Sequence, residues 1–510
     1  MLVPAPTSST PGEGAFTLTG GTAVHAPDAP EIAELLRELL SVPTGLAFPA
    51  ASAPGEGTIE LLVDPEDTEL GAEGYRLTVT TAGVTASAAG LAGLRWAVQA
   101  LRQLLPPEAF ARTRVDGVAW TVPAVSITDV PRYPWRGAML DVGRWHKPIE
   151  WLYTFADLAA MHRLNVFQLH LTEDQGWRFE VKRYPRLTEV GAFRRESPRG
   201  HEADKATDGT PHGGFYTQDQ LRDLVAYAAR RGVTIVPEID VPGHTQAAVA
   251  AYPELGNDPA NPPEVGVRFG VSRRVLNAEE STVEFVRNVL DELMDVFPSP
   301  YIHLGGDEVP LDEWSASPAA QARIAELGLD GPGSVLGWWI GRVAEHVTSK
   351  GRLAVVWDEL VGQAPAGAVV MAWRARDRVV AALEAGHDVV ATPNSDMYLN
   401  YPASLDPGEP LSIASHGLPG FGPTPLSKMY AYDPEPGSEP ENGARVIGVQ
   451  GNLWTEYAPT PERAEYDLMP RLAAVAEVAW GSARDEEGLR ERLVTHLRRL
   501  DAAGIGYRPL

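Results

Sequence analysis

Short apolar runs alternate with amphipathic helical stretches from Arg136 onward. Continuous apolar runs of this length are typical of parallel strands that are buried on both faces. They predict strands at Gly137–Val142, Asn165–Leu171, Val233–Ile239, Tyr301–Leu304, Leu353–Trp357, Ala368–Trp373, Asp388–Ala391 and Val446–Leu453. Between them, 3.6-residue periodicity predicts helices that include Pro148–His162, Thr217–Arg231, Val283–Val296, Ser334–Ser349 and Arg376–Ala385. Eight strands in roughly 370 residues favour an α/β fold of the (β/α)8 TIM barrel type, and a doubly wound open sheet is the alternative.

The first 130 residues have a different pattern. They are rich in Ala, Gly, Pro and Thr, and their apolar positions predict two strands and two helices, at Thr58–Val63, Tyr75–Thr80, Glu31–Leu40 and Ala89–Leu105. Two prolines in Asp129–Pro134 favour an extended linker. We therefore expect a small α+β domain over residues 1–130 and the barrel over residues 131–510.

Composition excludes several kinds of partner and site. The 510 residues carry a net charge of -25, which disfavours nucleic acid and anionic membranes because both require a basic face. Cysteine is absent, so the chain has neither disulfides nor thiolate metal sites. The N-terminal residues 1–11 contain neither the basic nor the apolar region of a signal peptide, and no apolar run is long enough to span a membrane. We expect a cytoplasmic protein, or a secreted one if a leader has been removed. The sequence leaves the oligomeric state open.

Polar and aromatic side chains follow the predicted strands, at the ends that form the active face of a βα barrel. In strand order they are Asp141 and Arg144; His170, Glu173, Asp174 and Trp177; Glu238, Asp240 and His244; Asp307 and Glu308; Trp357, Asp358 and Glu359; Trp373; Tyr398; and Trp454 and Glu456. Longer irregular segments at 194–216, 255–275 and 395–444 are expected on the same face. Together they predict a pocket lined by carboxylates and aromatic rings.

Two chemistries fit such a pocket. A lone Asp after a strand, such as Asp240 or Asp358, is more often a turn or cap residue than a catalyst. Asp307 and Glu308 differ, because the preceding glycines leave room for backbone or ligand. Paired carboxylates beside tryptophans favour glycoside hydrolysis, since sugars stack their C–H faces on aromatic rings. Alternatively, oxygens of Asp240, Asp307 or Glu308, and Asp358 could bind Mg²⁺.

Five motifs resemble those of glycoside hydrolase family 20, the β-N-acetylhexosaminidases. In chain order they are Arg136-Gly-Ala-Met-Leu-Asp-Val142, His170-Leu-Thr-Glu-Asp-Gln-Gly-Trp-Arg178, Val236-Pro-Glu-Ile-Asp-Val-Pro-Gly-His244, His303-Leu-Gly-Gly-Asp-Glu308 and Asn452-Leu-Trp-Thr-Glu456. The resemblance covers the chain from about Arg136 to its end, and residues 1–130 look like the small domain that precedes the barrel in this family. It implies an exo-acting enzyme that removes terminal β-linked N-acetylglucosamine, or N-acetylgalactosamine, from an oligosaccharide or glycoconjugate, without a cofactor or metal ion.

The resemblance also implies a retaining mechanism in which the substrate supplies the nucleophile. Its 2-acetamido oxygen attacks the anomeric carbon and forms an oxazolinium ion. Glu308 would protonate the leaving oxygen and then activate water, and Asp307 would orient the acetamido N–H. Tyr398 would hydrogen-bond to the acetamido oxygen. His244 would pair with the acidic residue of the His170 motif and support Glu308, so Glu173 and Asp174 join the expected catalytic set.

The remaining expected residues bind the sugar. By the same resemblance, Trp338 (or its neighbour Trp339), Trp357 and Trp454 would wall the acetamido pocket, and Arg136 and Glu456 would bind hydroxyls. We also expect His170, Trp373 and Asn400 to bind substrate. Three departures from the family pattern stand out. Glu173 replaces a usual Asp, Asn400 replaces an Asp two residues after the tyrosine, and Gly143–Pro148 differs from the usual Arg-His-aromatic form.

Overall fold

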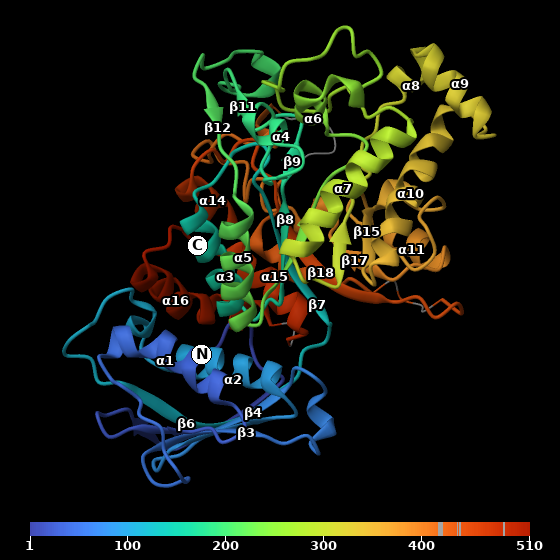
Figure 1. Cartoon of the computed structure of the whole chain (residues 1–510). Helices are drawn as coiled ribbons and strands as arrows, with labels where there is room; N and C mark the ends of the chain where they lie inside the picture. Colours follow the sequence, from blue (N-terminus) through green and yellow to red (C-terminus); the bar gives the residue numbers. More distant parts are fainter. Residues whose placement is uncertain (417–421, 436, 438–439, 483–484) are drawn as a thin grey trace.

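Eight parallel strands close into a barrel at the centre of the larger domain (Figure 1). The computed structural model describes residues 1–416, 422–435, 437, 440–482 and 485–510. The strands are β7 Trp135–Asp141, β8 Val166–His170, β13 Thr234–Glu238, β14 Tyr301–His303, β15 Leu353–Trp357, β16 Val369–Ala372, β17 Val389–Ala391 and β18 Val446–Leu453. Pairing of β18 with β7 closes the ring. The predicted barrel is thus confirmed, and the open sheet is excluded.

Helices surround the barrel because their apolar faces pack on its outer surface. The longer ones are α3 Ile149–Met161, α5 Gln218–Arg230, α7 Glu280–Val296, α9 Pro318–Glu326, α10 Val335–Ser349, α11 Arg376–Glu384, α14 Pro461–Leu468, α15 Arg471–Trp480 and α16 Glu486–Ala503. The amphipathic α5 begins after Thr217, which caps the backbone N–H of Gln220. Among the described residues, every helix is too short or too polar to cross a bilayer.

Short elements lie in the loops between strands and helices. They are β9 Thr172–Glu173, β10 Gly176–Trp177, β11 Phe193–Arg194, β12 His212–Gly213, α4 Arg186–Glu189, α6 Gln246–Ala251, α8 Asp312–Ala316, α12 Asn394–Met397 and α13 Leu426–Ala431. Within the expected irregular segment 395–444, residues 417–421, 436 and 438–439 lie outside the described part of the chain.

The N-terminal domain is a six-stranded sheet covered on one face by two helices. The sheet order is β1-β6-β4-β5-β3-β2, with mixed parallel and antiparallel pairing. Its elements are β1 Ser8–Thr17, β2 Ala23–His25, α1 Pro30–Thr44, β3 Thr58–Val63, β4 Tyr75–Val79, β5 Val84–Ala88, α2 Leu91–Leu104 and β6 Thr121–Asp129. Figure 1 shows α1 and α2 between this sheet and the barrel, so the helices form the joint between the two domains.

The barrel interior changes character along its axis. Apolar side chains such as Met139, Val236 and Met371 fill the lumen. Toward the carboxyl ends of the strands, buried polar residues take over, among them Gln168, Glu238 and His303. Trp357, Tyr398 and Trp454 then complete the apolar cluster at that end. The strands therefore present an aromatic and charged surface to the loops that follow them.

Candidate active site

A cavity of about 540 Å³ lies at the carboxyl end of the barrel strands. Its lining combines acids, an arginine and aromatic rings: Arg144, His201, Glu202, Phe269, Gly270, Val271, Asp307, Glu308, Trp357, Trp373, Arg374, Asn394, Tyr398, Asn400, Tyr401, Ile413, Trp454, Glu456 and Tyr457. The segments expected on this face contribute His201, Phe269 and Asn400 among others. The cavity thus lies where the strand-end residues predicted an active site.

A larger cavity, of about 780 Å³, lies near the opposite ends of the strands and is lined partly by the first domain. Its carboxylates have other roles. Glu73 is paired with Arg136 at 2.5 Å, and Asp388 accepts a hydrogen bond from the backbone N–H of Arg445. Size alone would favour this cavity, but its acids are engaged in holding the fold. The strand-end cavity remains the candidate active site.

The backbone around Asp307 and Glu308 depends on the two preceding glycines. Gly305 and Gly306 have φ of 68° and 93°, in the left-handed region that favours glycine. A Cβ on Gly305 would lie 1.8 Å from Oδ1 of Asp240. Glu308 itself has a φ of 51°, an uncommon and strained conformation for a side-chain-bearing residue. This turn places both carboxylates on the cavity wall.

Glu308 has the electrostatic surroundings of a general acid. Burial raises the pKa of its carboxyl, and the negative charge of Asp307 raises it further, while His244 and Arg144 act in the opposite direction. The net shift is upward, so Glu308 keeps its proton to higher pH than an ordinary glutamic acid. Its side chain is also 41% exposed, which gives a substrate access to it. Glu308 can therefore donate a proton within the cavity.

His244 links this acid pair to Glu173. Its Nδ1 lies 3.0 Å from Oε2 of Glu173, and its Nε2 lies 3.7 Å from both Oδ2 of Asp307 and Oε2 of Glu308. Burial lowers the pKa of His244, but Glu173 and Asp307 raise it more, to well above its usual value. The glutamate that departs from the family pattern therefore still reaches the histidine.

Asp174 holds loops next to this group. Its carboxylate accepts hydrogen bonds from the backbone N–H groups of Gln246 at 3.0 Å and Ser272 at 3.1 Å. Burial raises the pKa of its carboxyl to about 6. Asp174 is not part of the cavity lining, and Oδ2 lies 3.8 Å from Nδ1 of His244. Its contacts are those of a loop-organising residue beside the site.

Four aromatic rings form a box at the base of the cavity. Trp373 and Tyr398 are nearly parallel, with centroids 6.1 Å apart and an interplanar angle of 14°. Trp454 lies 6.0 Å from Trp357 and 6.3 Å from Tyr398. Rings around a small space provide flat apolar surfaces on several sides, which suits a methyl group or the C–H face of a sugar.

The expectation for Trp338 is corrected by the structure. Trp338 is half-buried on α10, packs against the hydrophobic core and has the guanidinium carbon of Arg323 5.9 Å from its ring centroid. Its neighbour Trp339 is fully buried and donates a hydrogen bond to the carbonyl of Asn277. Neither lines the cavity. The place of a third tryptophan beside Trp357 and Trp454 is taken by Trp373.

The expectation for Arg136 is also corrected. Arg136 is fully buried near the start of β7, at the opposite end of the barrel from Asp307. It bonds to Glu73, to the carbonyl of Tyr133 at 2.8 Å and to the carbonyl of Arg163 at 3.0 Å. It therefore joins the barrel to the first domain and cannot reach a sugar in the cavity.

Arg144, three residues beyond β7, is the arginine that lines the cavity. Its Nη1 lies 2.8 Å from Glu173 and 3.3 Å from Asp141, and its guanidinium carbon is 4.9 Å from the ring centroid of Trp454. Its buried Nε has no hydrogen-bond partner among the described residues. The sequence places Arg144 among the strand-end residues, and this position after the strand is the signal that indicates a site residue.

Two buried oxygens also point to polar recognition. Oδ1 of Asn400 and Oε2 of Glu456 lack hydrogen-bond partners within the described part of the chain, although both residues line the cavity. Burying an unpaired polar atom costs free energy unless a ligand or water satisfies it. With the free Nε of Arg144, these acceptors can bind hydroxyl groups.

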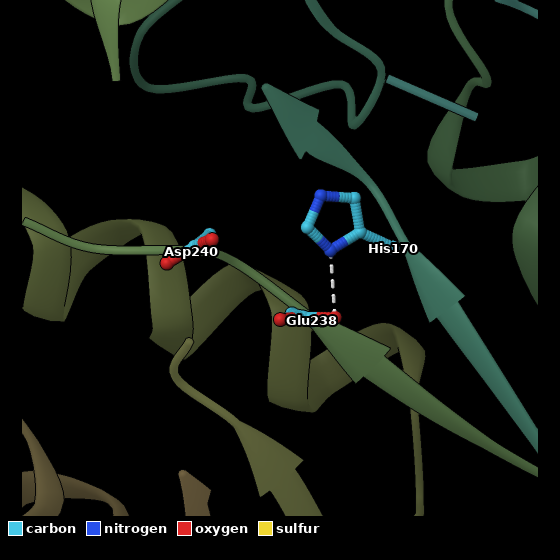
Figure 2. Close-up of side chains that lie close together, drawn as sticks. All are labelled: His170, Glu238 and Asp240. Atoms are coloured by element: carbon cyan, nitrogen blue, oxygen red, sulfur yellow. Dashed lines mark ion pairs between the residues drawn. The ribbon is translucent and has the colours of Figure 1, made fainter. Parts of the chain in front are cut away.

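His170 differs from its expected role. It is fully buried and is not part of the cavity lining. Its Nδ1 is 2.7 Å from Oε2 of Glu238 (Figure 2), and its Nε2 is 3.1 Å from Oε1 of Glu173. Contrary to the expectation that His170 binds substrate, both of its ring nitrogens face carboxylates of the protein.

Metal binding was the rival chemistry. His170, Glu238 and Asp240 lie close enough for their ligand atoms to share an ion, as do Asp240, His244 and Asp307 (Figure 2 shows the first group). In the first group, however, the imidazole and Glu238 already bond to each other. In the second, Oδ1 of Asp240 accepts the backbone N–H of Gly306 at 3.0 Å. The contact between His170 and Glu238 thus accounts for the first group, whereas Oδ2 of Asp240, Nε2 of His244 and Oδ1 of Asp307 in the second have no hydrogen-bond partner among the described residues.

Glu359 is a strand-end residue to which the sequence assigns no role in the site. Its Oε2 accepts a hydrogen bond from Nε1 of Trp373 at 3.1 Å. Burial, together with Asp307 and Asp358, raises its pKa to about 8. Glu359 therefore supports one wall of the aromatic box from outside the cavity. The sequence placed it after a strand but could not show which ring it meets.

Comparison with known proteins identifies related families and enzymes. Residues 133–483 match "Glycosyl hydrolase family 20, catalytic domain" and residues 1–130 match "Glycosyl hydrolase family 20, domain 2". A "Beta-hexosaminidase" from Porphyromonas gingivalis is 38% identical over 99% of this chain, which spans 64% of that protein. A "Beta-N-acetylhexosaminidase" from Cellulomonas fimi is 34% identical, covering 96% of this chain and 92% of that one.

Solved structures show the same architecture over the whole chain. The GH20 β-N-acetylhexosaminidase of Streptomyces coelicolor A3(2) superposes with a TM-score of 0.84 at 32% identity, covering 100% of this chain and 97% of that one. A Streptomyces plicatus β-hexosaminidase mutant solved with its product GlcNAc has the same TM-score and identity, with coverage of 100% and 96%. Sequence and structure agree that this chain belongs to glycoside hydrolase family 20.

Proposed function

We propose that the chain is an exo-acting β-N-acetylhexosaminidase that removes terminal β-linked N-acetylglucosamine, or N-acetylgalactosamine, from an oligosaccharide or glycoconjugate. The observation that carries the proposal is the juxtaposition of Glu308, an acid with a raised pKa, with Asp307 and a box of four aromatic rings. Relatives named as hexosaminidases, and a related enzyme solved with GlcNAc, support it.

The aromatic box suits the 2-acetamido group of the substrate. Its methyl group would lie between Trp357, Trp373 and Trp454, with the Tyr398 hydroxyl donating to the acetamido oxygen. The Asp307 carboxylate would accept the acetamido N–H. Held in this way, the acetamido oxygen is close to the anomeric carbon, and such preorganisation is worth several powers of ten in rate.

The reaction then proceeds in two displacements. The acetamido oxygen forms a bond to the anomeric carbon as the glycosidic bond breaks, and Glu308 gives its proton to the departing oxygen. Asp307 stabilises the resulting oxazolinium cation by its negative charge. In the second step the Glu308 carboxylate takes a proton from water and the water oxygen bonds to the anomeric carbon. The bond between this carbon and the acetamido oxygen breaks, which opens the oxazolinium ring and restores the acetamido group. Two inversions leave the β configuration retained.

Exo action is supported by a group of packed side chains that line the cavity next to Glu456. His201 stacks on Tyr457 at a centroid distance of 5.6 Å, and Phe269 meets the same tyrosine at 6.2 Å. Glu202 pairs with Arg268 at 2.9 Å, which ties the loops carrying His201 and Phe269 together. Tyr457 directly follows Glu456, so these side chains line the cavity beside a residue that we propose binds hydroxyl groups. Chain extension from a hydroxyl of the bound sugar would therefore meet protein.

Hydrolysis of a chromogenic aryl β-N-acetylglucosaminide by Glu308→Gln tests the assignment. Loss of a general acid costs about 10²–10⁴ in kcat, and least for leaving groups that need no proton. We expect the loss to be larger for a disaccharide than for a nitrophenyl glycoside. A thiazoline mimic of the oxazolinium should bind wild type tightly and Asp307→Asn weakly. Near-wild-type turnover by Glu308→Gln, or no thiazoline inhibition, would contradict the proposal.

A further inference from the structure

Glu238 is a buried carboxylate beneath the site that the mechanism above does not use. It is the last residue of β13 and is fully buried. Its Oε2 lies 2.7 Å from both Nε2 of Gln168 and Nδ1 of His170. Its Oε1 accepts from Nε1 of Trp357 at 3.0 Å and lies 3.1 Å from Nδ1 of His303. A buried acid surrounded in this way is held in one orientation by several strands.

This carboxylate begins a chain of alternating charges that ends at the acid pair. Figure 2 shows its first contact, between Glu238 and His170. His170 then contacts Glu173 at 3.1 Å, Glu173 contacts His244 at 3.0 Å, and His244 faces Asp307 and Glu308. Each imidazole lies between carboxylates, and each carboxylate in the middle of the chain lies between imidazoles.

The charges in this chain depend on one another. Burial opposes charge on Glu238, but His170 and His303 hold its pKa far below the usual range. Burial likewise lowers the pKa of His170, but Glu238 and Glu173 raise it to well above its ordinary value. His170 can present a protonated nitrogen to each of these two carboxylates only as an imidazolium. Without the charge of Glu238, a neutral ring becomes the favoured form.

Glu238 also supports the cavity wall. Trp357, which lines the cavity, is 1% exposed, and its indole N–H bonds to Glu238. The same carboxylate thus contacts an aromatic wall through one oxygen and the charge chain through the other. The titratable groups near it are His170 on β8, His303 on β14, whose Nδ1 accepts the backbone N–H of Gly305 at 3.0 Å, and Asp240 on its own chain segment. Burial, Asp307 and Glu238 raise the pKa of Asp240.

We propose that Glu238 is a positioning residue of the active site. Its carboxylate holds His170 as an imidazolium and fixes the indole of Trp357, so that Glu173 keeps His244 directed at Glu308. This role rests on the proposed hexosaminidase activity, because it acts through the general acid and the aromatic box of that reaction. Glu238 touches neither the substrate nor the reacting atoms.

Two variants separate the charge of Glu238 from its shape. Glu238→Gln keeps the size, but its amide N–H group favours a neutral His170 with an accepting Nδ1. Glu238→Asp keeps the charge at a shorter reach. Asp129→Asn is the matched control, because Asp129 is equally buried and paired with Arg163 but belongs to β6 of the first domain. The control should lower the Tm without moving the pH profile.

The first measurement follows the ring nitrogens of His170 by ¹⁵N NMR, and it requires no activity. We expect a doubly protonated ring at neutral pH in the wild type and in Glu238→Asp, and a neutral ring in Glu238→Gln. The His170 signal is assigned by its loss in His170→Asn. A doubly protonated His170 in Glu238→Gln would overturn the proposal, whether or not the wild type hydrolyses hexosaminides.

The second measurement is the pH profile of kcat. For Glu238→Gln we expect kcat to fall roughly 10–100-fold through misplacement of the site. The limb set by Glu308 should move to higher pH by roughly half a unit, because the lost imidazolium charge is nearer to Glu308 than the lost carboxylate. Glu238→Asp should recover part of both. An unmoved profile, with a fall in kcat no larger than that of Asp129→Asn, would show a merely structural role. Inactive wild type would instead refute the proposed function.

Discussion

Replacing Arg136 by methionine tests whether this arginine, near the start of β7, stabilises the fold, whereas Arg144, beyond the end of β7, binds substrate. Arg136 is fully buried, and the change removes its bonds to Glu73, Tyr133 and Arg163 while keeping an unbranched apolar side chain. Removing one partner of a buried ion pair costs about 3–5 kcal/mol. With an unfolding entropy of about 2.1 cal/mol/K per residue, a barrel of roughly 380 residues loses about 4–6 °C in Tm.

The assay pairs thermal unfolding with steady-state kinetics on an aryl β-N-acetylglucosaminide. We expect Arg136→Met to unfold at lower temperature while its KM stays within about twofold of wild type, because its side chain lies at the other end of the barrel. The matched variant Arg144→Met should lower kcat/KM by at least about 100-fold, since it removes a hydroxyl-binding cation and releases Glu173. A large rise in KM for Arg136→Met with an unchanged Tm would refute this reasoning.

Three further predictions follow from buried titrating groups and from the cavity lining. The folded-state pKa of Glu359 is raised to about 8, so its contribution to stability is complete below pH 4.5 and is lost as the pH rises toward 8. Glu359→Gln should therefore flatten the fall in Tm over this pH range. A pH profile of Tm identical to that of the wild type would contradict this prediction. His162 and His496 contact each other through their Nε2 atoms at 3.0 Å, and burial lowers the pKa of His162 to about 4. The stability that they contribute is therefore present above pH 6.5 and is lost as the pH falls toward 4. Calorimetry should show that Tm falls less steeply with decreasing pH in His496→Gln than in the wild type. Asn400→Asp adds a negative charge to a cavity that holds Asp307, Glu308 and Glu456, which should raise the pKa of Glu308. The alkaline limb of the pH profile of kcat/KM should therefore move up by about 0.5–1 pH unit. An unmoved limb would show that residue 400 does not interact electrostatically with Glu308.

The sequence predicted the barrel strands well because their signal is local. All eight were found within one or two residues, since a parallel strand that is buried on both faces needs a continuous apolar run. The first domain was predicted less completely. Its edge strand β1 is exposed along most of its length and contains Pro11, Gly12 and Gly14, so it has no apolar alternation by which to find it.

The errors at the site came from direction and distance. A strand rises about 3.3 Å per residue, so the part of β7 from Arg136 to its end at Asp141 alone spans roughly 16 Å, and Arg144 lies beyond that end. Applying the rule that barrel sites form at carboxyl strand ends to our own motif would have favoured Arg144. The sequence could not show whether Trp338 or Trp339 lines the cavity, because helical periodicity does not reveal which loops or core residues a helix face contacts. Pairs such as Glu359 with Trp373 join different strands and leave no local pattern.

The left-handed backbone at Glu308 has an evolutionary consequence. A φ of 51° on a side-chain-bearing residue costs on the order of 1 kcal/mol, and burial of its carboxyl adds to that cost. Glycine at this position would remove both costs. This gain in stability would be partly offset, because glycine gives the unfolded chain more conformational entropy to lose on folding. A variant selected for stability alone would therefore keep the aromatic box and lose the proton donor, so that it binds the sugar without cleaving it. Stability does not explain a glutamate in this strained turn, whereas proton transfer to a leaving group does.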